Sequence, residues 1–467
     1  MAHVDAAVRG ADTAAVTVDG AGEVNGKSTY NVMVCLPEPL MLGSFRMVLT
    51  VSSAPNLLLA FHASLPASLL YPVTDTTQKC PVTRTSQRLL ALGSLRMWAL
   101  CTDNASVMVS MRTAAEAGGL VLATYGCFAH AVNLISKELC ARAPFLRVLK
   151  SIIAAMVFCR RYTRARADLA EDRATQKAAG NNINELRTFS PTRWVGQSLT
   201  LRAFIDNLPG LRRVLLFNSH RPSALTFAVP PAMADAITDG AVEATAKDLF
   251  PCLQLISRLS ASLEADVSPL SSVLGLFSSL CIVLRGNTFV ALGTARSFVS
   301  DCLVARFSSY SHPLMVYAFY LDPSYDSCRQ QVGVDLWGGE HLPLIRGQAV
   351  HNLCAGHEVL EQTVLRELSS CLRHTNVRTA ALSRRLLHPV TWWELYGTQW
   401  PTLHFLASRL FTLPTSSAAS ERTVKALSVV LCRTRNRTLD DKVDKQWRII
   451  VKKKQLRRGD LTGEYTR

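Results

Sequence analysis

The chain has 467 residues, of which 48% are hydrophobic and 18% are charged. This balance supplies enough apolar side chains for a buried core and excludes a mostly disordered protein. Lysine and arginine outnumber aspartate and glutamate by 51 to 35, which gives a formal net charge of +16. A basic excess of this size predicts an acidic partner, and nucleic acid is the first candidate.

The predicted elements of the first 140 residues alternate between strands and helices, which indicates a mixed α/β sheet. The expected strands are Thr13–Val18, Ser28–Leu36, Phe45–Ser52, Met97–Thr102 and Leu120–Tyr125. The expected helices are Ala105–Ala117, which the glycine pair Gly118-Gly119 ends, and Cys127–Leu139. Residues 53–96 carry four prolines and give no clear pattern.

The chain beyond residue 143 has the apolar spacing of helices, with leucine, isoleucine, valine and phenylalanine every three to four residues. Breaks are expected at Ala178–Asn182 and at Pro230–Thr238, and Leu382–Lys454 is helical again. The longest uncharged apolar stretch, Val267–Leu284, contains serines, a glycine and a proline, so a buried helix is expected and no membrane span.

The N-terminus has no apolar run after a basic start, and the 13 cysteines are scattered without a dense framework. We therefore expect an intracellular, reducing compartment and mostly buried thiols. The residues from Leu431 to Arg467 include 12 basic and five acidic ones. Lys452, Lys453 and Lys454 belong to a basic cluster typical of nuclear import or of phosphate contact, so a nuclear location is expected. A solvated tail is the alternative.

Two aspartates end predicted strands. Asp19 follows the first strand and Asp103 follows the fourth. If these strands are neighbours, both carboxylates emerge at one edge of the sheet, where a divalent cation such as magnesium or manganese would offset their repulsion. Such ions serve phosphoryl transfer. The alternative is local: Asp103 also suits a helix N-cap, and Asp19-Gly20 also suits a turn.

Three further motifs have a functional and a structural interpretation. Cys127 and His130 form half of a zinc site at best, and packing within an apolar helix is the alternative. Arg193-Trp194 suits contact with a phosphate and an unpaired base, or a core tryptophan beside a surface arginine. Glu421 is either a third metal-binding carboxylate or a residue that stabilises the first turn of a helix, which Ser416 or Ser417 would cap.

Six blocks in order resemble the hAT family of DNA transposases and the domesticated proteins derived from them. The most specific is Ser417-Ala418-Ala419-Ser420-Glu421-Arg422. This block is preceded by Trp392-Trp393 to Ala407, which belongs to the same C-terminal part of the resemblance. The other five blocks are Val16–Gly20 with Tyr30–Met33, then Cys101–Ser106, Cys127–Leu134, Pro191–Trp194, and finally His312-Pro313 with Leu321-Asp322-Pro323.

The resemblance implies a ribonuclease H-like mixed sheet interrupted by a large helical insertion, with a helical C-terminal dimerisation region. The implied parts are 13–142 (first part of the core), 143–379 (insertion), 380–458 (dimerisation region completing the core) and 459–467 (basic, flexible tail). It also implies a triad of Asp19, Asp103 and Glu421 that holds Mg or Mn and catalyses phosphoryl transfer. Contacts with DNA would come from Cys127, His130, Arg193, Trp194 and Arg422.

The chain departs from the family pattern at several positions, and these departures bear on whether it is an active transposase. Ala21 stands where the family usually has a tryptophan, Thr423 follows Arg422 where an aromatic residue is usual, and no BED-type zinc finger precedes residue 13. We therefore expect a domesticated or degenerate protein that dimerises through residues 380–458 and binds DNA through phosphates. An active metal-dependent transposase and a decayed fragment are the alternatives, so enzymatic activity is left open.

Overall fold

The protein is described from a computed structural model. The structure describes residues 14–22, 27–35, 39–48, 97–117, 121–181, 183, 185–186, 196–223, 226–266, 268–285, 295–326, 350, 354, 358–373, 387–430, 446 and 449–450.

A five-stranded mixed sheet is formed by the N-terminal part of the described chain, in the spatial order β3-β2-β1-β4-β5. β1 pairs antiparallel with β2, and β2 pairs antiparallel with β3. On its other side β1 pairs parallel with β4, which pairs parallel with β5. The strands are β1 (Ala14–Gly22), β2 (Lys27–Cys35), β3 (Pro39–Val48), β4 (Met97–Thr102) and β5 (Ala123–Gly126).

The strands form where the sequence is rich in residues that are buried on both faces. Val16 and Val18 of β1 and Val32 and Val34 of β2 are all fully buried. β4 has the predicted bounds, whereas β3 begins six residues before the predicted Phe45 and β5 three residues after the predicted Leu120. Because side chains alternate along a strand, Thr17 and Asn31 lie on the opposite face, and both are fully buried as well.

Clustering of contacts divides the chain into two compact units. The first unit comprises Met1–His130, Ser262–Ser278 and Phe307–Arg467, and the second comprises Ala131–Ala261 and Ser279–Arg306. Four helices contribute residues to both units: α6 (Phe128–Ala141), α11 (Gly240–Leu263), α12 (Ser272–Arg285) and α13 (Ala295–Tyr310).

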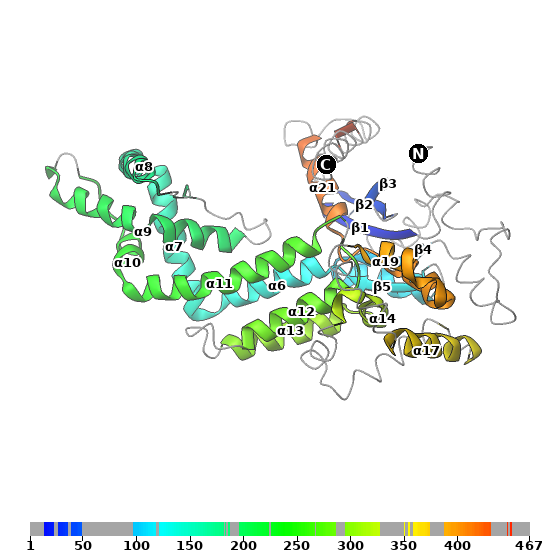
Figure 1. The fold of residues 1–467 in the computed structure, drawn as a ribbon. Coiled ribbons are helices and arrows are strands. Elements are labelled where there is room, and N and C mark those ends of the chain that lie inside the picture. The colour runs from blue at the N-terminus through cyan, green and yellow to red at the C-terminus, as the bar shows by residue number, and fades with distance from the viewer. Residues whose placement is uncertain are drawn as a thin grey trace. The chain divides into compact units, whose positions relative to one another are not determined.

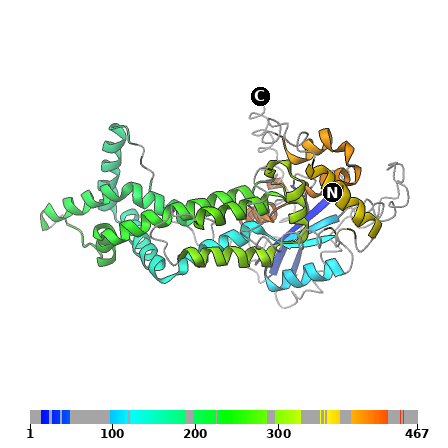
Figure 2. The same cartoon turned by 60° about the horizontal axis from the view of Figure 1, so that its bottom comes forward.

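Helices cover the sheet in the first unit. α5 (Ser106–Ala117) lies against β4 and β5, and α21 (Ala418–Val430) lies against β1 and β2 (Figures 1 and 2). Between α13 and α21 the chain forms α14 (Pro313–Leu321), η3 (Pro323–Tyr325), α17 (Glu358–Arg373), α19 (Pro389–Tyr396), η4 (Gly397–Gln399) and α20 (Pro401–Leu410).

In the second unit, the described residues form helices joined by short connections and contain no strand. Besides parts of the four shared helices, it contains α7 (Ala143–Arg161), α8 (Thr163–Ala178), α9 (Gly196–His220) and α10 (Pro231–Thr238). α7 packs against α8, α9 and α10. The break expected at Pro230–Thr238 is wrong: Pro231 occupies the first turn of α10, where its missing N–H and fixed φ favour a helix start.

The apolar stretch near residue 270 forms α12, whose Val273, Leu274 and Phe277 are fully buried. Among the described residues, no helix combines the length and the apolar character that crossing a membrane requires. The thiols of Cys101 and Cys252 are also fully buried, as expected from the cysteine pattern.

The C-terminal aromatic residues pack within the first unit. Trp392 and Trp393 are almost fully buried and contact each other edge to face, with ring centroids 5.3 Å apart. Trp393 Nε1 donates a 2.9 Å hydrogen bond to the carbonyl oxygen of Leu321, and Trp98 of β4 contacts Phe405 of α20. The two tryptophans are therefore buried on the core of their own chain.

Candidate functional site

Three residues with reactive side chains follow the last parallel pairs of β1, β4 and β5. Asp19 itself lies within β1, because the strand continues beside β2 to Gly22 and does not end at Val18 as predicted. Val18 of β1 pairs with Thr102 of β4, and Thr102 pairs with Gly126 of β5. The residues that come next are Asp19, Asp103 and Cys127. Because neighbouring strands lie about 4.8 Å apart, these residues form a row across one edge of the sheet. We call Asp19, Asp103 and Cys127 the strand-end row.

Helix α21 covers the same face of the sheet as Asp19. The hydroxyls of Thr17 and Ser420 share a 2.5 Å hydrogen bond, and Ser420 Oγ also donates to the carbonyl of Thr17 at 3.1 Å. Asn31 Nδ2 donates to the carbonyl of Ser420 at 3.3 Å. Since side chains two apart on a strand share a face, Asp19 lies on the face of Thr17 and therefore on that of α21.

The segment before α21 closes over the end of β5. Tyr125 Oη donates a 2.8 Å hydrogen bond to the carbonyl of Pro414, and the amide of Phe128 donates to the carbonyl of Thr415 at 3.2 Å. The amide of Ser417 donates to Cys127 Sγ at 3.3 Å. These contacts join residues almost 300 positions apart and fix the first turn of α21 beside the strand-end row.

Ser416 lies just before α21. Its Oγ accepts a long hydrogen bond of 3.4 Å from the amide of Ala418 and donates to the carbonyl of Leu263 at 2.7 Å. Thr415 Oγ1 donates to the same carbonyl at 2.9 Å. Ser416 thus contacts the first amide of α21 and ties the segment to the end of α11, while Ser417 holds the N-cap position, because its carbonyl accepts from the Glu421 amide.

The turn between β4 and α5 is held by a buried arginine. Arg112 Nη1 donates hydrogen bonds of 2.6 Å to Thr102 Oγ1 and to the carbonyl of Asp103, and Nη2 donates to Asn104 Oδ1. Asp103 Oδ1 accepts from the amide of Ala105 at 3.2 Å. The local interpretation of Asp103 therefore has structural support, because one carboxylate oxygen satisfies a backbone donor before α5.

The thiol of Cys127 is neutral at physiological pH. Burial raises its pKa to about 11, the hydrogen bond from Ser417 opposes this rise, and the negative charge of Asp19 adds to it. Burial also raises the pKa of Cys101 well above its ordinary value. Burial lowers the pKa of the Arg112 guanidinium, although nearby Cys101 and Asp103 favour its charged form. The Cys127 thiol therefore adds no negative charge to this edge of the sheet at physiological pH.

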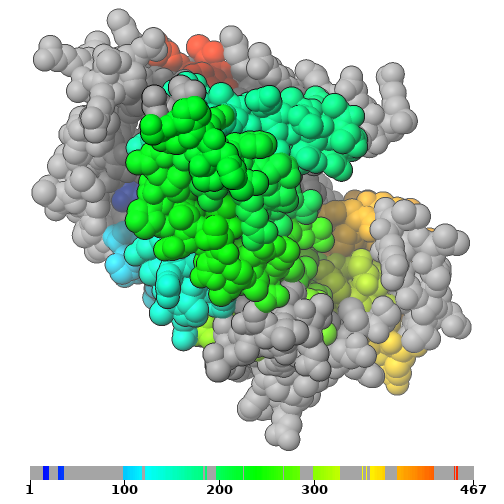
Figure 3. All heavy atoms as spheres, turned by 90° about the vertical axis from the view of Figure 1, so that its left-hand side faces the viewer, coloured from blue at the N-terminus to red at the C-terminus, as the bar shows by residue number. Residues whose placement is uncertain are grey.

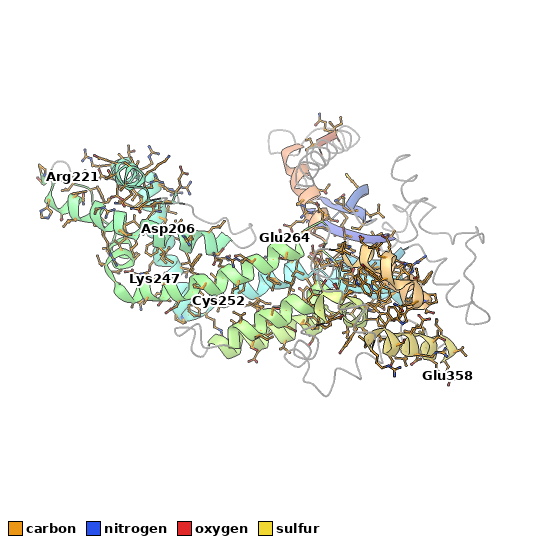
Figure 4. All side chains as sticks on the ribbon, viewed as in Figure 1. Asp206, Arg221, Lys247, Cys252, Glu264 and Glu358 are labelled. Atoms are coloured by element: carbon orange, nitrogen blue, oxygen red, sulfur yellow. The ribbon has the colours of Figure 1, made fainter. Side chains whose placement is uncertain are left out.

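Glu421 and Arg422 lie in the first turn of α21 and are half-buried. The amide of Glu421 donates to the carbonyl of Ser417 at 3.1 Å. Arg422 donates a 2.9 Å hydrogen bond to the carbonyl of Glu264 and forms an ion pair with Asp266. Glu264 is labelled at the end of α11 in Figure 4. Arg422 thus holds α21 to this segment, and its contact with DNA stays a prediction.

The predicted metal ligands are three carboxylates. Asp19, Asp103 and Glu421 all belong to the described residues. Within that set, no group of three or more histidine, cysteine, aspartate and glutamate side chains is arranged to hold a metal ion. The fold brings the three residues to one region of the sheet, but the metal and catalytic roles assigned to them stay predictions.

The other predicted site residues have different outcomes. His130 is half-buried in the first turn of α6, next to the buried Cys127. Arg193, Trp194 and the cluster Lys452, Lys453 and Lys454 lie outside the described residues. Their contacts with DNA stay predictions.

Arg112 belongs to this region although it was not among the predicted site residues. It lies on the buried face of α5 with Met108, Met111 and Ala115. A charged residue at helical spacing among apolar ones was the available signal, because a buried arginine must find hydrogen-bond acceptors. Here its acceptors are the groups of the β4–α5 turn.

The fold and this region define a mostly helical protein with a small mixed sheet in its N-terminal part. Residues 366–448 match the hAT family C-terminal dimerisation region. The chain therefore carries such a region, which includes α19, α20 and α21 and implies self-association. No curated protein matches the chain.

Proposed function

We propose that this chain is a hAT transposase-like protein, domesticated or degenerate, that dimerises through its C-terminal region and binds DNA. The observation that carries the proposal is the dimerisation region at residues 366–448. The net charge of +16 supports a polyanionic partner such as DNA. The basic cluster Lys452, Lys453 and Lys454 supports a nuclear location.

The strand order supports a ribonuclease H-like core as the finer description of the fold. An antiparallel β1–β2–β3 meander continues into parallel β4 and β5, with β1 at the centre. The helical second unit follows β5 along the chain, and α21 returns to β1 and β2. The contact between Thr17 and Ser420, 403 positions apart, is the clearest sign that the C-terminal region completes this core.

The dimer contact is proposed on the exposed side of the C-terminal region. The tryptophans there are buried within the chain, so they are not available to a partner. Leu395 of α19 lies inside the matched region and is 59% exposed. A large apolar side chain at this exposure in a dimerisation region is the best candidate for burial against a second copy.

Substitution of Leu395 tests the proposal. We expect Leu395→Lys to weaken the dimer at least tenfold, because a buried interface position would then have to take up a charge. Leu199→Lys on α9 is the matched control, since Leu199 is 61% exposed and lies outside the matched region. Light scattering after gel filtration, at a series of protein concentrations, measures the dimer stability of both variants. Equal dimer stability in the two variants would contradict this placement of the contact.

A second candidate function is phosphoryl transfer on DNA. It is favoured by the register that sets Asp19 beside Asp103, with α21 and its Glu421 on the same face. If the chain is active, the purified protein nicks duplex DNA in the presence of a divalent cation, and Asp103→Asn abolishes nicking. Absence of nicking by a folded, dimeric wild-type chain would contradict this second function and leave the first one intact.

A further inference from the structure

Helix α7 has a basic solvent face. Phe145, Ile152 and Met156 belong to its buried side, which packs against α8, α9 and α10. The opposite side carries exposed basic residues at helical spacing, which are Arg147, Lys150 and Arg161. With a rise of about 1.5 Å per residue, these three residues span about 21 Å along the helix. We call Arg147, Lys150 and Arg161 the basic row.

The region around the basic row contains no acidic residue in the sequence. Between Glu138 and Asp168 the chain has seven basic residues and no aspartate or glutamate; the seven are Arg142, Arg147, Lys150, Arg160, Arg161, Arg164 and Arg166. All seven are exposed. The stretch therefore contains no carboxylate of its own that could neutralise these seven positive charges.

Of the next three acidic residues, Glu171 is exposed, whereas Asp168 and Asp172 are engaged elsewhere. Asp168 accepts two hydrogen bonds of 2.7 Å from Arg221, which is labelled in Figure 4, and Asp172 forms an ion pair with Arg213 of α9. The side chains of Asp168 and Asp172 are only 10% exposed. These pairs join α8 to the end of α9 and do not cancel the charge of the basic row.

The corner between α7 and α8 adds a fixed aromatic residue. Tyr162 is 42% exposed, stacks on Phe158 at 5.1 Å and lies against Phe227 at the same distance. α8 begins after Tyr162 without a side-chain cap, and its first turn has arginines rather than acidic residues. Positive charge at the positive end of a helix dipole is unfavourable for an isolated helix, so an anionic partner would stabilise this corner. Atoms of α8, in teal, are exposed at the surface in Figure 3.

We propose that the basic row of α7 and the adjoining corner bind the phosphate backbone of duplex DNA. This rests on the DNA binding included in the proposed function and names the surface that performs it. A row of about 21 Å is long enough to reach phosphates on both sides of a major groove about 12 Å wide. The contacts are with phosphates, so binding is independent of DNA sequence and sensitive to salt.

Charge complementarity favours DNA over an acidic protein as the occupant. Interfaces between proteins are depleted of charged residues at their core, whereas phosphate contacts come mainly from arginine, lysine and hydroxyl groups such as that of tyrosine. The basic row and Tyr162 supply these groups, and the rigid packing of α7 holds them in place.

The test uses the full chain and a labelled duplex of about two helical turns, or about 21 base pairs. Fluorescence anisotropy measures Kd between about 50 and 200 mM salt. The variant is Arg147→Gln with Lys150→Gln and Arg161→Gln. The control is Lys137→Gln with Lys177→Gln and Lys247→Gln, which removes the same charge from exposed positions on α6, α8 and α11, outside the dimerisation region. Circular dichroism and the thermal midpoint verify that both variants fold.

We expect the basic-row variant to lose at least tenfold in affinity and its salt slope to fall by about 2.7, or about 0.9 for each lost phosphate contact. The control changes affinity much less. Arg147→Lys with Arg161→Lys restores binding to within about threefold, since lysine contacts a phosphate as a point charge.

Equal losses in the variant and the control would overturn the assignment of this surface while leaving DNA binding itself in place. A wild-type chain that binds no DNA would overturn both. Polyglutamate that competes as well as unlabelled DNA of equal charge would assign the surface to acidic proteins instead and overturn the proposal.

Discussion

Gly126, the last residue of β5, shows how closely the elements approach at the strand-end row. A Cβ atom at this position would lie 2.4 Å from Tyr310 Cδ1 and 2.8 Å from Asn104 Oδ1. Such distances require Tyr310 or Asn104 to move, although Asn104 accepts a hydrogen bond from Arg112. We expect Gly126→Ala to destabilise the fold by about 1–3 kcal/mol, as overpacking of a core does. Urea denaturation measures the loss.

Gly240 provides the matched control for this prediction. It begins α11, and a Cβ atom there would have no neighbour within 4 Å. Gly240→Ala should leave stability unchanged or raise it by up to about 1 kcal/mol, since alanine restricts the unfolded chain. A loss in Gly126→Ala no greater than in Gly240→Ala would contradict the close packing around β5.

Cys127 gives the site a defined response to alkaline pH. Its folded pKa is about 11 against an ordinary 9.0, chiefly because of burial. Below pH 9 the thiol is protonated in both states. As pH rises toward 11 the unfolded chain ionises first, so the free energy of unfolding falls. Cys127→Ala should remove about 2–3 kcal/mol of this alkaline loss, at about 1.4 kcal/mol per pKa unit.

Measurements of unfolding at pH 7 and pH 10.5 check this prediction. The difference between Cys127→Ala and wild type should shift in favour of the variant at the higher pH. The rest of the alkaline loss remains, because burial also raises the pKa of other thiols, such as those of Cys35 and Cys252. The same difference at both pH values would show that Cys127 ionises normally in the folded protein.

At the scale of elements, α21 is held on the sheet by Ser420. Its side chain is fully buried and bonds with Thr17, and its carbonyl accepts from Asn31. Ser420→Ala leaves the Thr17 hydroxyl without this partner, so we expect a loss of about 1–3 kcal/mol in unfolding free energy. Ser110→Ala on the exposed side of α5 is the control and should change little. Similar midpoints for the two variants would show that α21 is held by other contacts.

The bounds of a helix or strand were predictable where a run of buried residues is followed directly by a polar residue. β4 has the predicted bounds because its six residues favour a strand and the polar Asp103 follows them directly. α5 begins one residue after the predicted Ala105. β3 begins before the predicted Phe45, since its strand includes Pro39 and Gly43, residue types that are uncommon inside strands. The error at Pro231 has the same origin, because proline marks a helix start as well as an interruption.

The candidate site was predictable only in part. Two aspartates after two strands indicated a shared edge, and the register confirms that β1 and β4 are neighbours. The position of Glu421 depended on a family resemblance, because no local pattern links α21 to β1 across 403 positions. Contacts such as that between Ser417 and Cys127 come from packing of distant segments, which hydrophobic periodicity does not encode.

At the scale of the whole molecule, the features divide between the two units. The first unit contains the sheet, the strand-end row and the C-terminal dimerisation region. The second contains the basic row on α7. The predicted division at residues 142, 379 and 458 stays a prediction. In the proposed function, self-association brings two copies of each unit into one particle, so the affinity for DNA gains from the linkage of two basic rows.

The central claim is that the chain self-associates through its C-terminal region. Sedimentation equilibrium of the full-length wild-type chain tests it most directly, because the molar mass is obtained without reference to shape. The account predicts a mass of twice 51.2 kDa at micromolar concentrations, and a return toward 51.2 kDa in Leu395→Lys. A folded wild-type chain that remains at 51.2 kDa across the concentration series would contradict the account.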